Sequence, residues 1–206
     1  DMVQSEISML SKVSLYNDNL IAPARLFNEY FGSGLSSIVF QEIRESKALA
    51  YSAYSYFTTP NDLEKSHYIR AYLGTQVDKL GEATEALLEL MNNMPEVDAQ
   101  FEDARIASMK KIETSRTKRS NLFWQYLNAK KMNRNYDLNK DVYTDLNEMS
   151  MKDLKVFFDQ NIKGRDYAFT VIGNKQLVDI NAVKKLGRYQ ELTLEDIFGY
   201  WYKLIS

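Results

Sequence analysis

Arg44 and Tyr51 are the two side chains whose types and spacing favour chemistry on a peptide. Arg44 lies in the last turns of a predicted helix, and Tyr51 follows in a predicted strand. If the strand folds back beside the helix end, the guanidinium and the phenol point into one groove. Both groups donate hydrogen bonds of the kind that hold a peptide carbonyl or a developing oxyanion. The pair is therefore a candidate substrate-binding site.

Simpler interpretations of both residues stay open from spacing alone. The helix dipole favours a cation near the end of a helix, so Arg44 could form an ordinary surface ion pair with Glu42 or Glu45. Tyr51 could pack on one face of a sheet. The geometry of the corner between helix and strand decides between these alternatives.

The histidine and cysteine content excludes two classes of hydrolase site in this chain. A zinc hydrolase normally needs two histidines or a mixture of histidine and thiolate ligands. The sequence has one histidine, His67, no cysteine and no His-x-x-Glu-His pair. A Ser-His-Asp triad would also need His67, which lies in a predicted strand without a nucleophile-elbow sequence nearby. We expect a partly buried strand histidine, with no metal site and no catalytic residue in this chain alone.

Gly32-Ser33-Gly34 is a second glycine-bearing feature that could be mistaken for a phosphate loop. It lacks the Gly-Lys-Ser/Thr ending, and it follows a predicted helix where nucleotide-binding loops follow a strand. The segment is instead predicted to be a turn between two helices that requires a positive φ angle.

Basic and aromatic side chains between Lys110 and Arg134 form the pattern that most favours nucleic-acid binding. Phe123, Trp124 and Tyr126 are interleaved with the cations, as base stacking requires. Acidic neighbours dilute the charge, the net charge of the chain is −2, and aromatic residues at helical spacing commonly form core. The prediction is that nucleic acid is not a partner. The basic residues are Lys110, Lys111, Arg116, Lys118, Arg119, Lys130, Lys131 and Arg134.

Length and composition predict one globular domain. The 206 residues are 45% hydrophobic and 26% charged, which is ordinary for such a domain. No apolar run approaches the roughly 18–20 residues of a membrane span. The absence of cysteine fits a reducing compartment without requiring one, so the location is not predicted. The chain begins directly in strand-like alternation, and we expect it to be part of a longer protein.

The first half of the chain is predicted to contain three strands and two helices. Alternation predicts a strand over residues 3–16, with Val3, Ile7, Met9, Val13 and Leu15 on its buried face. A helix begins near Pro23, and a second, over residues 36–46, buries Leu35, Ile38, Val39 and Ile43. Residues 49–58 and 66–73 are predicted to pair as antiparallel strands, the second ending at Gly74.

The second half is predicted to be mainly helical. Helices are expected over residues 77–94, 142–149, 151–160 and 177–186, with two more between residues 98 and 134 that break near residues 119–121. Residues 167–173 are predicted as a central strand and 189–193 as a short last strand, followed by the aromatic residues Phe198, Tyr200, Trp201 and Tyr202. This order predicts an α+β fold over residues 1–206: a mostly antiparallel sheet with helices packed on one face.

The stretch from Gly32 to Ser52 carries a dense motif. It reads Gly-Ser-Gly-Leu-Ser-Ser over residues 32–37 and Phe-Gln-Glu-Ile-Arg-Glu-Ser-Lys-Ala-Leu-Ala-Tyr-Ser over residues 40–52. This resembles the non-catalytic half of the pitrilysin (insulinase-type) zinc peptidase family, whose pattern is close to Gly-Gly-Gly-x-Ser-Ser-x-Leu-Phe-x-Glu-Leu-Arg-Glu-x-x-Gly-Leu-Ala-Tyr-Ser. Ser33 and Ala48 stand where that pattern prefers glycine. Gln4, Tyr72-Leu73-Gly74-Thr75 and Ile172-Gly173-Asn174 support the resemblance.

The resemblance implies a division of labour between domains. Family members pack α+β domains in pairs, as two halves of a clamshell around a closed chamber. One domain supplies the zinc ligands, an inverted His-x-x-Glu-His and a distal Glu, and a later domain supplies an Arg and a Tyr that grip the substrate backbone near the scissile bond. Arg44 and Tyr51 fall on those two positions.

This chain is therefore expected to be the non-catalytic, substrate-binding domain of a zinc metalloendopeptidase that cleaves peptides or small unfolded proteins, and the last domain of that protein. Zinc would be held by the catalytic domain, on the same polypeptide or a partner subunit. An inactive homologue that serves as a structural subunit or peptide-binding scaffold is the alternative.

Overall fold

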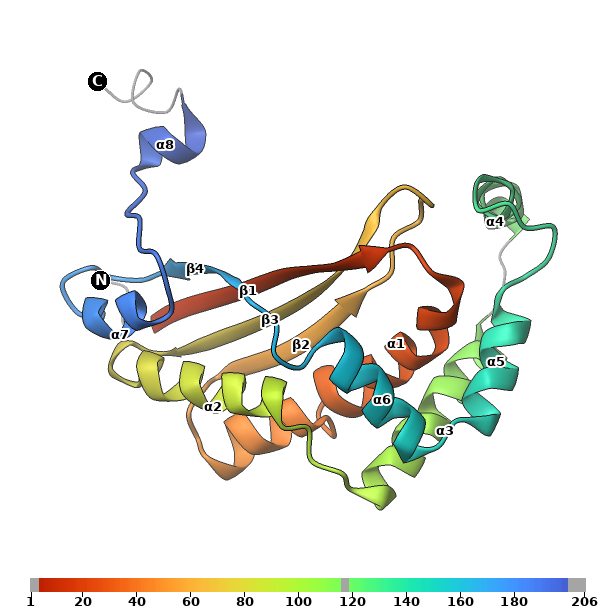
Figure 1. The fold of residues 1–206 in the computed structure, drawn as a ribbon, viewed down its shortest axis with the longest axis horizontal. Coiled ribbons are helices and arrows are strands. Elements are labelled where there is room, and N and C mark those ends of the chain that lie inside the picture. The colour runs from red at the N-terminus through yellow and green to blue at the C-terminus, as the bar shows by residue number, and fades with distance from the viewer. Residues whose placement is uncertain (1–3, 116–118, 200–206) are drawn as a thin grey trace.

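The computed structural model describes residues 4–115 and 119–199 (Figure 1). Val3, Arg116, Lys118, Tyr200, Trp201 and Tyr202, named above, lie outside these ranges. An antiparallel sheet of four strands in the order β2-β3-β1-β4 forms the centre of the described part. The strands are β1 (Gln4–Leu15), β2 (Ser52–Thr58), β3 (Ser66–Gln76) and β4 (Ala168–Ile172).

Helices pack against one face of this sheet, while α4 and α8 extend away from it (Figure 1). This arrangement confirms the predicted α+β fold. None of the helices within the described ranges is long and apolar enough to cross a membrane. The α-helices are α1 (Ile21–Phe27), α2 (Leu80–Asn92), α3 (Asp98–Thr114), α4 (Arg119–Lys131), α5 (Asn139–Glu148), α6 (Met151–Asn161), α7 (Ile180–Lys185) and α8 (Leu194–Phe198). Short 3₁₀ or π segments are η1 (Asp18–Leu20), η2 (Asn28–Gly32), η3 (Phe40–Ser46) and η4 (Val77–Lys79).

The core lies between the sheet and the helices. Ile7 and Met9 of β1 are buried there, as the alternation predicts. Leu15, predicted on the same face, is 61% exposed. The pairing of β1 with β3 shifts between Lys12 and Leu15, and this irregularity breaks the two-residue alternation before Leu15. Four phenylalanines at the centre of the core contact one another: Phe27, Phe31, Phe157 and Phe158.

The two glycines of the predicted helix–helix turn are needed for different reasons. Gly34 has a φ angle of 100°, a backbone conformation that favours glycine. At Gly32 a Cβ atom would lie 2.1 Å from the carbonyl oxygen of Ser55, because the helix passes close to β2. Nearby, the Asn28 side chain bonds both the N–H and the C=O of Phe57, at 2.7 and 3.0 Å. These contacts fix the 28–34 segment against the outer edge of β2.

Strand ends and strand positions differ from three predictions. β3 continues past Gly74 to Gln76, because Gly74 pairs with both Glu6 and Ser52 and is part of the ladder. β4 is an edge strand rather than a central one, since it pairs only with β1 in the described sheet. Residues 189–193 do not form a strand; Thr193 instead caps α8 through a reciprocal capping box with Asp196.

Leu35, which was predicted to be buried, and the aromatic residues of α4, of a kind that commonly forms core, are all exposed. Leu35 is 73% exposed, because it lies in the turn before η3. α4 begins at Arg119 and has no buried residue, so Leu122, Phe123, Trp124, Tyr126 and Leu127 do not form core with the rest of the described chain. These five residues are nearly consecutive and spread around the helix circumference, which leaves no single apolar face to bury.

Candidate functional site

The corner between η3 and β2 brings the helix end and the strand together. After η3 the chain turns through Ala48, a non-glycine residue with a φ angle of 48°. It then runs beside the end of β3, where the N–H of Tyr51 donates to the carbonyl of Gly74 at 2.8 Å. The N–H of Leu49 bonds back to Ile43 of the helix at 2.9 Å, and its carbonyl accepts from the Thr75 hydroxyl. The strand therefore folds back beside the helix end.

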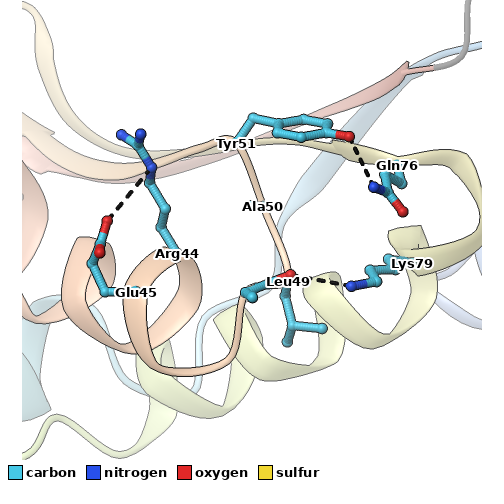
Figure 2. Close-up of a pocket in the computed structure, with 8 residues that line it drawn as sticks. Arg44, Glu45, Leu49, Ala50, Tyr51, Gln76 and Lys79 are labelled. Atoms are coloured by element: carbon cyan, nitrogen blue, oxygen red, sulfur yellow. Dashed lines mark hydrogen bonds and ion pairs between the residues drawn. The ribbon is translucent and has the colours of Figure 1, made fainter.

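A pocket of about 280 Å³ opens at this corner (Figure 2). It brings the two predicted site residues, Arg44 and Tyr51, into one lining. The residues that line it are Arg44, Glu45, Ala48, Leu49, Ala50, Tyr51, Gln76 and Lys79. In Figure 2, Arg44 and Glu45 lie on one side of the segment 49–51, and Gln76 and Lys79 lie on the other.

Arg44 combines an ion pair with an accessible guanidinium. Its Nε atom lies 3.7 Å from a carboxylate oxygen of Glu45, and its side chain is 46% exposed. The guanidinium carbon lies 4.8 Å from the centroid of the Phe40 ring, one turn earlier. The two terminal nitrogens point away from Glu45 (Figure 2). The surface ion pair with Glu45 is thus present, and it leaves these nitrogens facing away from that carboxylate.

Tyr51 is held by a neighbouring strand rather than packed into a sheet face. The residue is 50% exposed. Its hydroxyl oxygen accepts a hydrogen bond of 2.9 Å from the side-chain amide of Gln76. Because the oxygen acts as the acceptor, the hydroxyl hydrogen is available for a further acceptor. The ring points toward Gln76 and away from the Arg44 guanidinium (Figure 2), so the two predicted residues line one pocket from separate sides.

Gln76 and Lys79 are lining residues that the sequence analysis missed. Lys79 donates from its ammonium group to the carbonyl of Ala48 at 3.2 Å, and Gln76 contacts Tyr51 as described. β3 was predicted to end at Gly74, which placed both residues outside the strand pair. Continued two-residue spacing through Tyr72, Gly74 and Gln76 is a signal that could have extended the strand. No local pattern marks Lys79.

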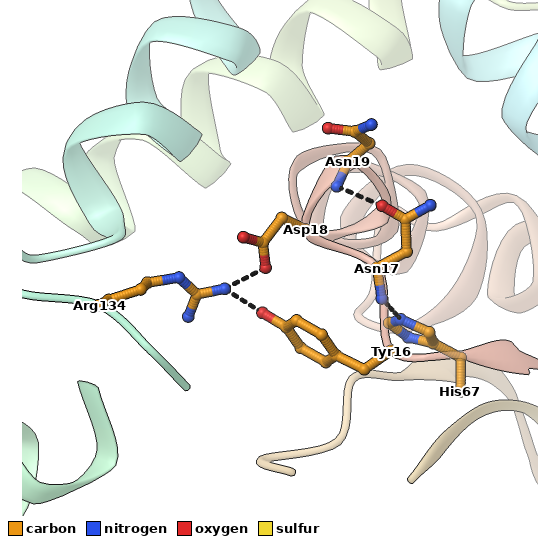
Figure 3. Close-up of polar contacts among 6 residues, drawn as sticks. All are labelled: Tyr16, Asn17, Asp18, Asn19, His67 and Arg134. Atoms are coloured by element: carbon orange, nitrogen blue, oxygen red, sulfur yellow. Dashed lines mark hydrogen bonds and ion pairs between the residues drawn. The ribbon is translucent and has the colours of Figure 1, made fainter. Parts of the chain in front are cut away.

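Zinc does not fit the donor groups of the residues that the structure describes. His67 is fully buried in β3. Its Nε2 atom accepts from the N–H of Asn17 at 3.2 Å (Figure 3), and its Nδ1 atom bonds the carbonyl of Thr58 at 3.1 Å. Burial lowers the pKa of the imidazole below its ordinary value. Both ring nitrogens are thus occupied, and within residues 4–115 and 119–199 no group of three His, Cys, Asp or Glu residues could hold a metal ion.

The basic residues between 110 and 134 are partly neutralised by carboxylates from elsewhere in the fold. Lys111 pairs with Glu29, and Lys131 pairs with Asp62 at 3.0 Å. Arg134 bonds both Asp18 and the hydroxyl of Tyr16 (Figure 3). These three cations connect α3, α4 and the following loop to other parts of the chain and do not form one continuous basic strip.

Comparison with known proteins places this fold and corner in a family. Residues 4–109 match the family described as the peptidase M16 inactive domain. The chain belongs to this family. The match includes η3, the corner and β3, and it confirms the resemblance to the non-catalytic half of the zinc peptidases. The chain is a non-catalytic M16 domain.

Relatives of this M16 inactive domain include a zinc protease of greater length. The chain is 29% identical over 102 residues to the uncharacterized zinc protease YmxG of Bacillus subtilis (strain 168), an alignment that covers 46% of this chain and 24% of YmxG. It is similar in fold to a peptidase M16 inactive domain from Pseudomonas fluorescens, with a TM-score of 0.66, 17% identity and coverage of 82% of this chain and 40% of that one.

A third relative has a chain of similar extent. The inactive peptidase domain of a putative zinc protease from Bordetella parapertussis matches with a TM-score of 0.67 and 9% identity, covering 85% of this chain and 92% of that chain. At these identities the solved structures show the fold alone. The aligned part of this chain covers about a quarter of YmxG and two fifths of the Pseudomonas chain, but nearly all of the Bordetella one.

Proposed function

We propose that this M16 inactive domain is the substrate-binding half of a zinc metalloendopeptidase that cleaves peptides or small unfolded proteins. Arg44 and Tyr51 hold carbonyl oxygens of the substrate backbone near the scissile bond. Zinc and the general base that activates water come from the catalytic domain. The observation that carries this proposal is that both side chains line the same pocket.

The chemistry of the two donors supports this role. A guanidinium presents planar N–H groups that match carbonyl and oxyanion geometry, and the Tyr51 hydroxyl keeps its hydrogen for an acceptor because Gln76 donates to its oxygen. Donors aimed at charge that develops in the transition state typically contribute about 10²–10³-fold each in rate. Neither residue binds metal, so their contribution adds to that of the zinc site.

We also propose that residues 1–206 form one domain, the last of a longer peptidase. The coverage of 92% of the Bordetella chain supports a unit of this extent. The coverage of 40% of the Pseudomonas chain supports a longer protein. The partner is then the catalytic domain of the same polypeptide or of a partner subunit, and the two face each other across the bound peptide.

The test uses the full-length protein with its catalytic partner. Arg44→Ala and Tyr51→Phe should each lower kcat/KM for peptide hydrolysis roughly 10²-fold, while the zinc content stays normal. Arg70→Ala and Tyr126→Phe are matched controls, because both residues are exposed and neither lines the pocket. Unchanged kinetics in the Arg44 and Tyr51 variants would contradict the assignment.

The alternative, a scaffold without catalysis, gives a different result in the same assay. An intact protein that binds peptide but does not hydrolyse it, with no His-x-x-Glu-His in its remaining sequence or partner subunit, would be a structural or peptide-binding homologue. In that case Arg44→Ala would weaken peptide binding, and there would be no rate to change.

A further inference from the structure

Lys79 is a cation of the pocket, and no carboxylate in the described part of the chain pairs with it. Its side chain is half-buried at the pocket wall, and its ammonium group contacts the carbonyl oxygen of Ala48. Within the described residues it forms no ion pair. Glu45, the acidic residue of the lining, lies beside Arg44 on the other side of segment 49–51 (Figure 2). The Lys79 side of the pocket therefore carries an uncompensated positive charge.

The bond from Lys79 to Ala48 does not use up the ammonium group. An ammonium has three N–H donors, and the Ala48 carbonyl takes one of them. The carbonyl carries only a partial negative charge, so it does not neutralise the lysine. In a half-buried position the effective dielectric constant is lower than in water, which strengthens the attraction between Lys79 and an added carboxylate.

We propose that Lys79 makes this pocket a subsite for a carboxylate of the bound peptide, from an acidic side chain or from a free C-terminus. The proposal rests on the peptide-binding function given above and names the kind of substrate that the site prefers. A volume of about 280 Å³ lies just below the range typical for whole drug-sized ligands, so the pocket suits one side chain or one chain end. Arg44 and Tyr51 then hold the backbone of the peptide, while Lys79 binds the carboxylate next to it.

This selection should appear in KM rather than in kcat. The carboxylate contacts Lys79 equally in the ground state and in the transition state, and uniform binding of this kind changes KM. A lysine that only braces the Ala48 corner would instead affect all peptides alike. The difference between acidic and neutral peptides therefore separates the two roles.

The experiment compares matched peptides with the full-length protein. The peptides carry Glu, Gln or Lys at each position flanking the cleavage point in turn, and each is made with a free or an amidated C-terminus. The expected result is a KM about three- to ten-fold lower for a carboxylate than for its neutral counterpart at one position. The series with free and amidated ends shows whether the carboxylate belongs to a side chain or to the terminus.

Variants of Lys79 complete the test. Lys79→Gln should abolish the preference, Lys79→Arg should retain it, and Lys79→Glu should reverse it toward the Lys peptide. Lys47→Gln is the matched control, because Lys47 is exposed at the same corner and does not line the pocket. A preference that survives Lys79→Gln, or one that is absent from the wild type, would overturn the proposal.

The results distinguish a failure of the carboxylate subsite from a failure of the proposed function. If Arg44→Ala and Tyr51→Phe slow hydrolysis of every peptide while Lys79→Gln changes acidic and neutral peptides equally, the carboxylate subsite alone is wrong. If Arg44→Ala and Tyr51→Phe change nothing, the substrate-binding function itself is wrong.

Discussion

The side-chain amide of Gln76 donates a hydrogen bond of 2.9 Å to the hydroxyl oxygen of Tyr51. This bond joins the phenol of the proposed site to the last residue of β3. It restrains the ring of the half-exposed Tyr51, and it leaves the hydroxyl hydrogen for the substrate contact that we propose. Gln76 therefore acts through Tyr51, as a positioning residue for the phenol.

The direction of this hydrogen bond gives the first prediction. In Gln76→Glu the new carboxylate accepts from the Tyr51 hydroxyl, which turns the hydrogen away from substrate. We expect kcat/KM to fall nearly as far as in Tyr51→Phe, about 10²-fold, whereas Gln76→Ala should lose about ten-fold or less. A double variant with Tyr51→Phe should show no further loss, because the two residues act as one unit. Gln176→Glu, at an exposed site away from the pocket, is the charge control. Additive losses in the double variant would show that Gln76 does not act through Tyr51.

The second prediction separates the two glycines of the turn. Gly32→Ala places a Cβ atom 2.1 Å from the backbone oxygen of Ser55, and neither backbone can move without displacing β2 or the helix. We expect a loss of more than about 3 kcal/mol in the free energy of unfolding. Gly34→Ala meets no atom within 4 Å and pays only for its positive φ angle, about 1–2 kcal/mol. Urea denaturation of both variants measures their free energies of unfolding, and Gly32→Ala should lose more than Gly34→Ala. An equal loss in the two variants would contradict this explanation.

Local patterns predicted the parts of the fold whose partners are close in sequence. Alternation placed Ile7 and Met9 in the core, and the helix predicted over residues 151–160 is present as α6, capped by Ser150. The same reasoning failed at residues 189–193, which were predicted to form a short last strand. Thr193 and Asp196 satisfy the backbone of a helix start instead, and a capping box outweighs a weak strand propensity.

The candidate site was predictable in part, because two of its residues are close to each other in the sequence. Arg44 and Tyr51 are separated by a single corner, so a helix followed by a returning strand is enough to bring them near one pocket. Gln76 and Lys79 reach the corner from 25 and 31 residues away in sequence. Their positions depend on the pairing register of β3 and on the start of the next helix, and neither is encoded by residues near the site.

The third prediction concerns Ala48, which occupies a position where the sequence pattern of the family prefers glycine. A φ angle of 48° destabilises the folded state of an L-residue by about 1–2 kcal/mol. Glycine would remove this strain, but its greater conformational entropy in the unfolded chain would lower the stability by about 0.4–1 kcal/mol. We therefore expect Ala48→Gly to raise the free energy of unfolding by about 0.5–1 kcal/mol in urea denaturation. Ala50→Gly is the matched control. It lies in the same corner without a positive φ angle, so glycine relieves no strain there and should destabilise. Destabilisation by both changes would argue against strain at Ala48.

The fourth prediction is a pH dependence of stability that arises from His67. Burial lowers the pKa of the folded imidazole, so the unfolded chain binds the extra proton below its own pKa of about 6.5. The stabilisation is therefore complete above that pH and is lost as the pH falls toward the folded pKa. Protonation of Nε2 would also remove the acceptor for the Asn17 N–H. We expect urea denaturation to give a lower free energy of unfolding at pH 5.5 than at pH 7.5. His67→Asn should flatten this difference, even though it lowers stability at both values. A variant that keeps the full pH dependence would place its origin in another group.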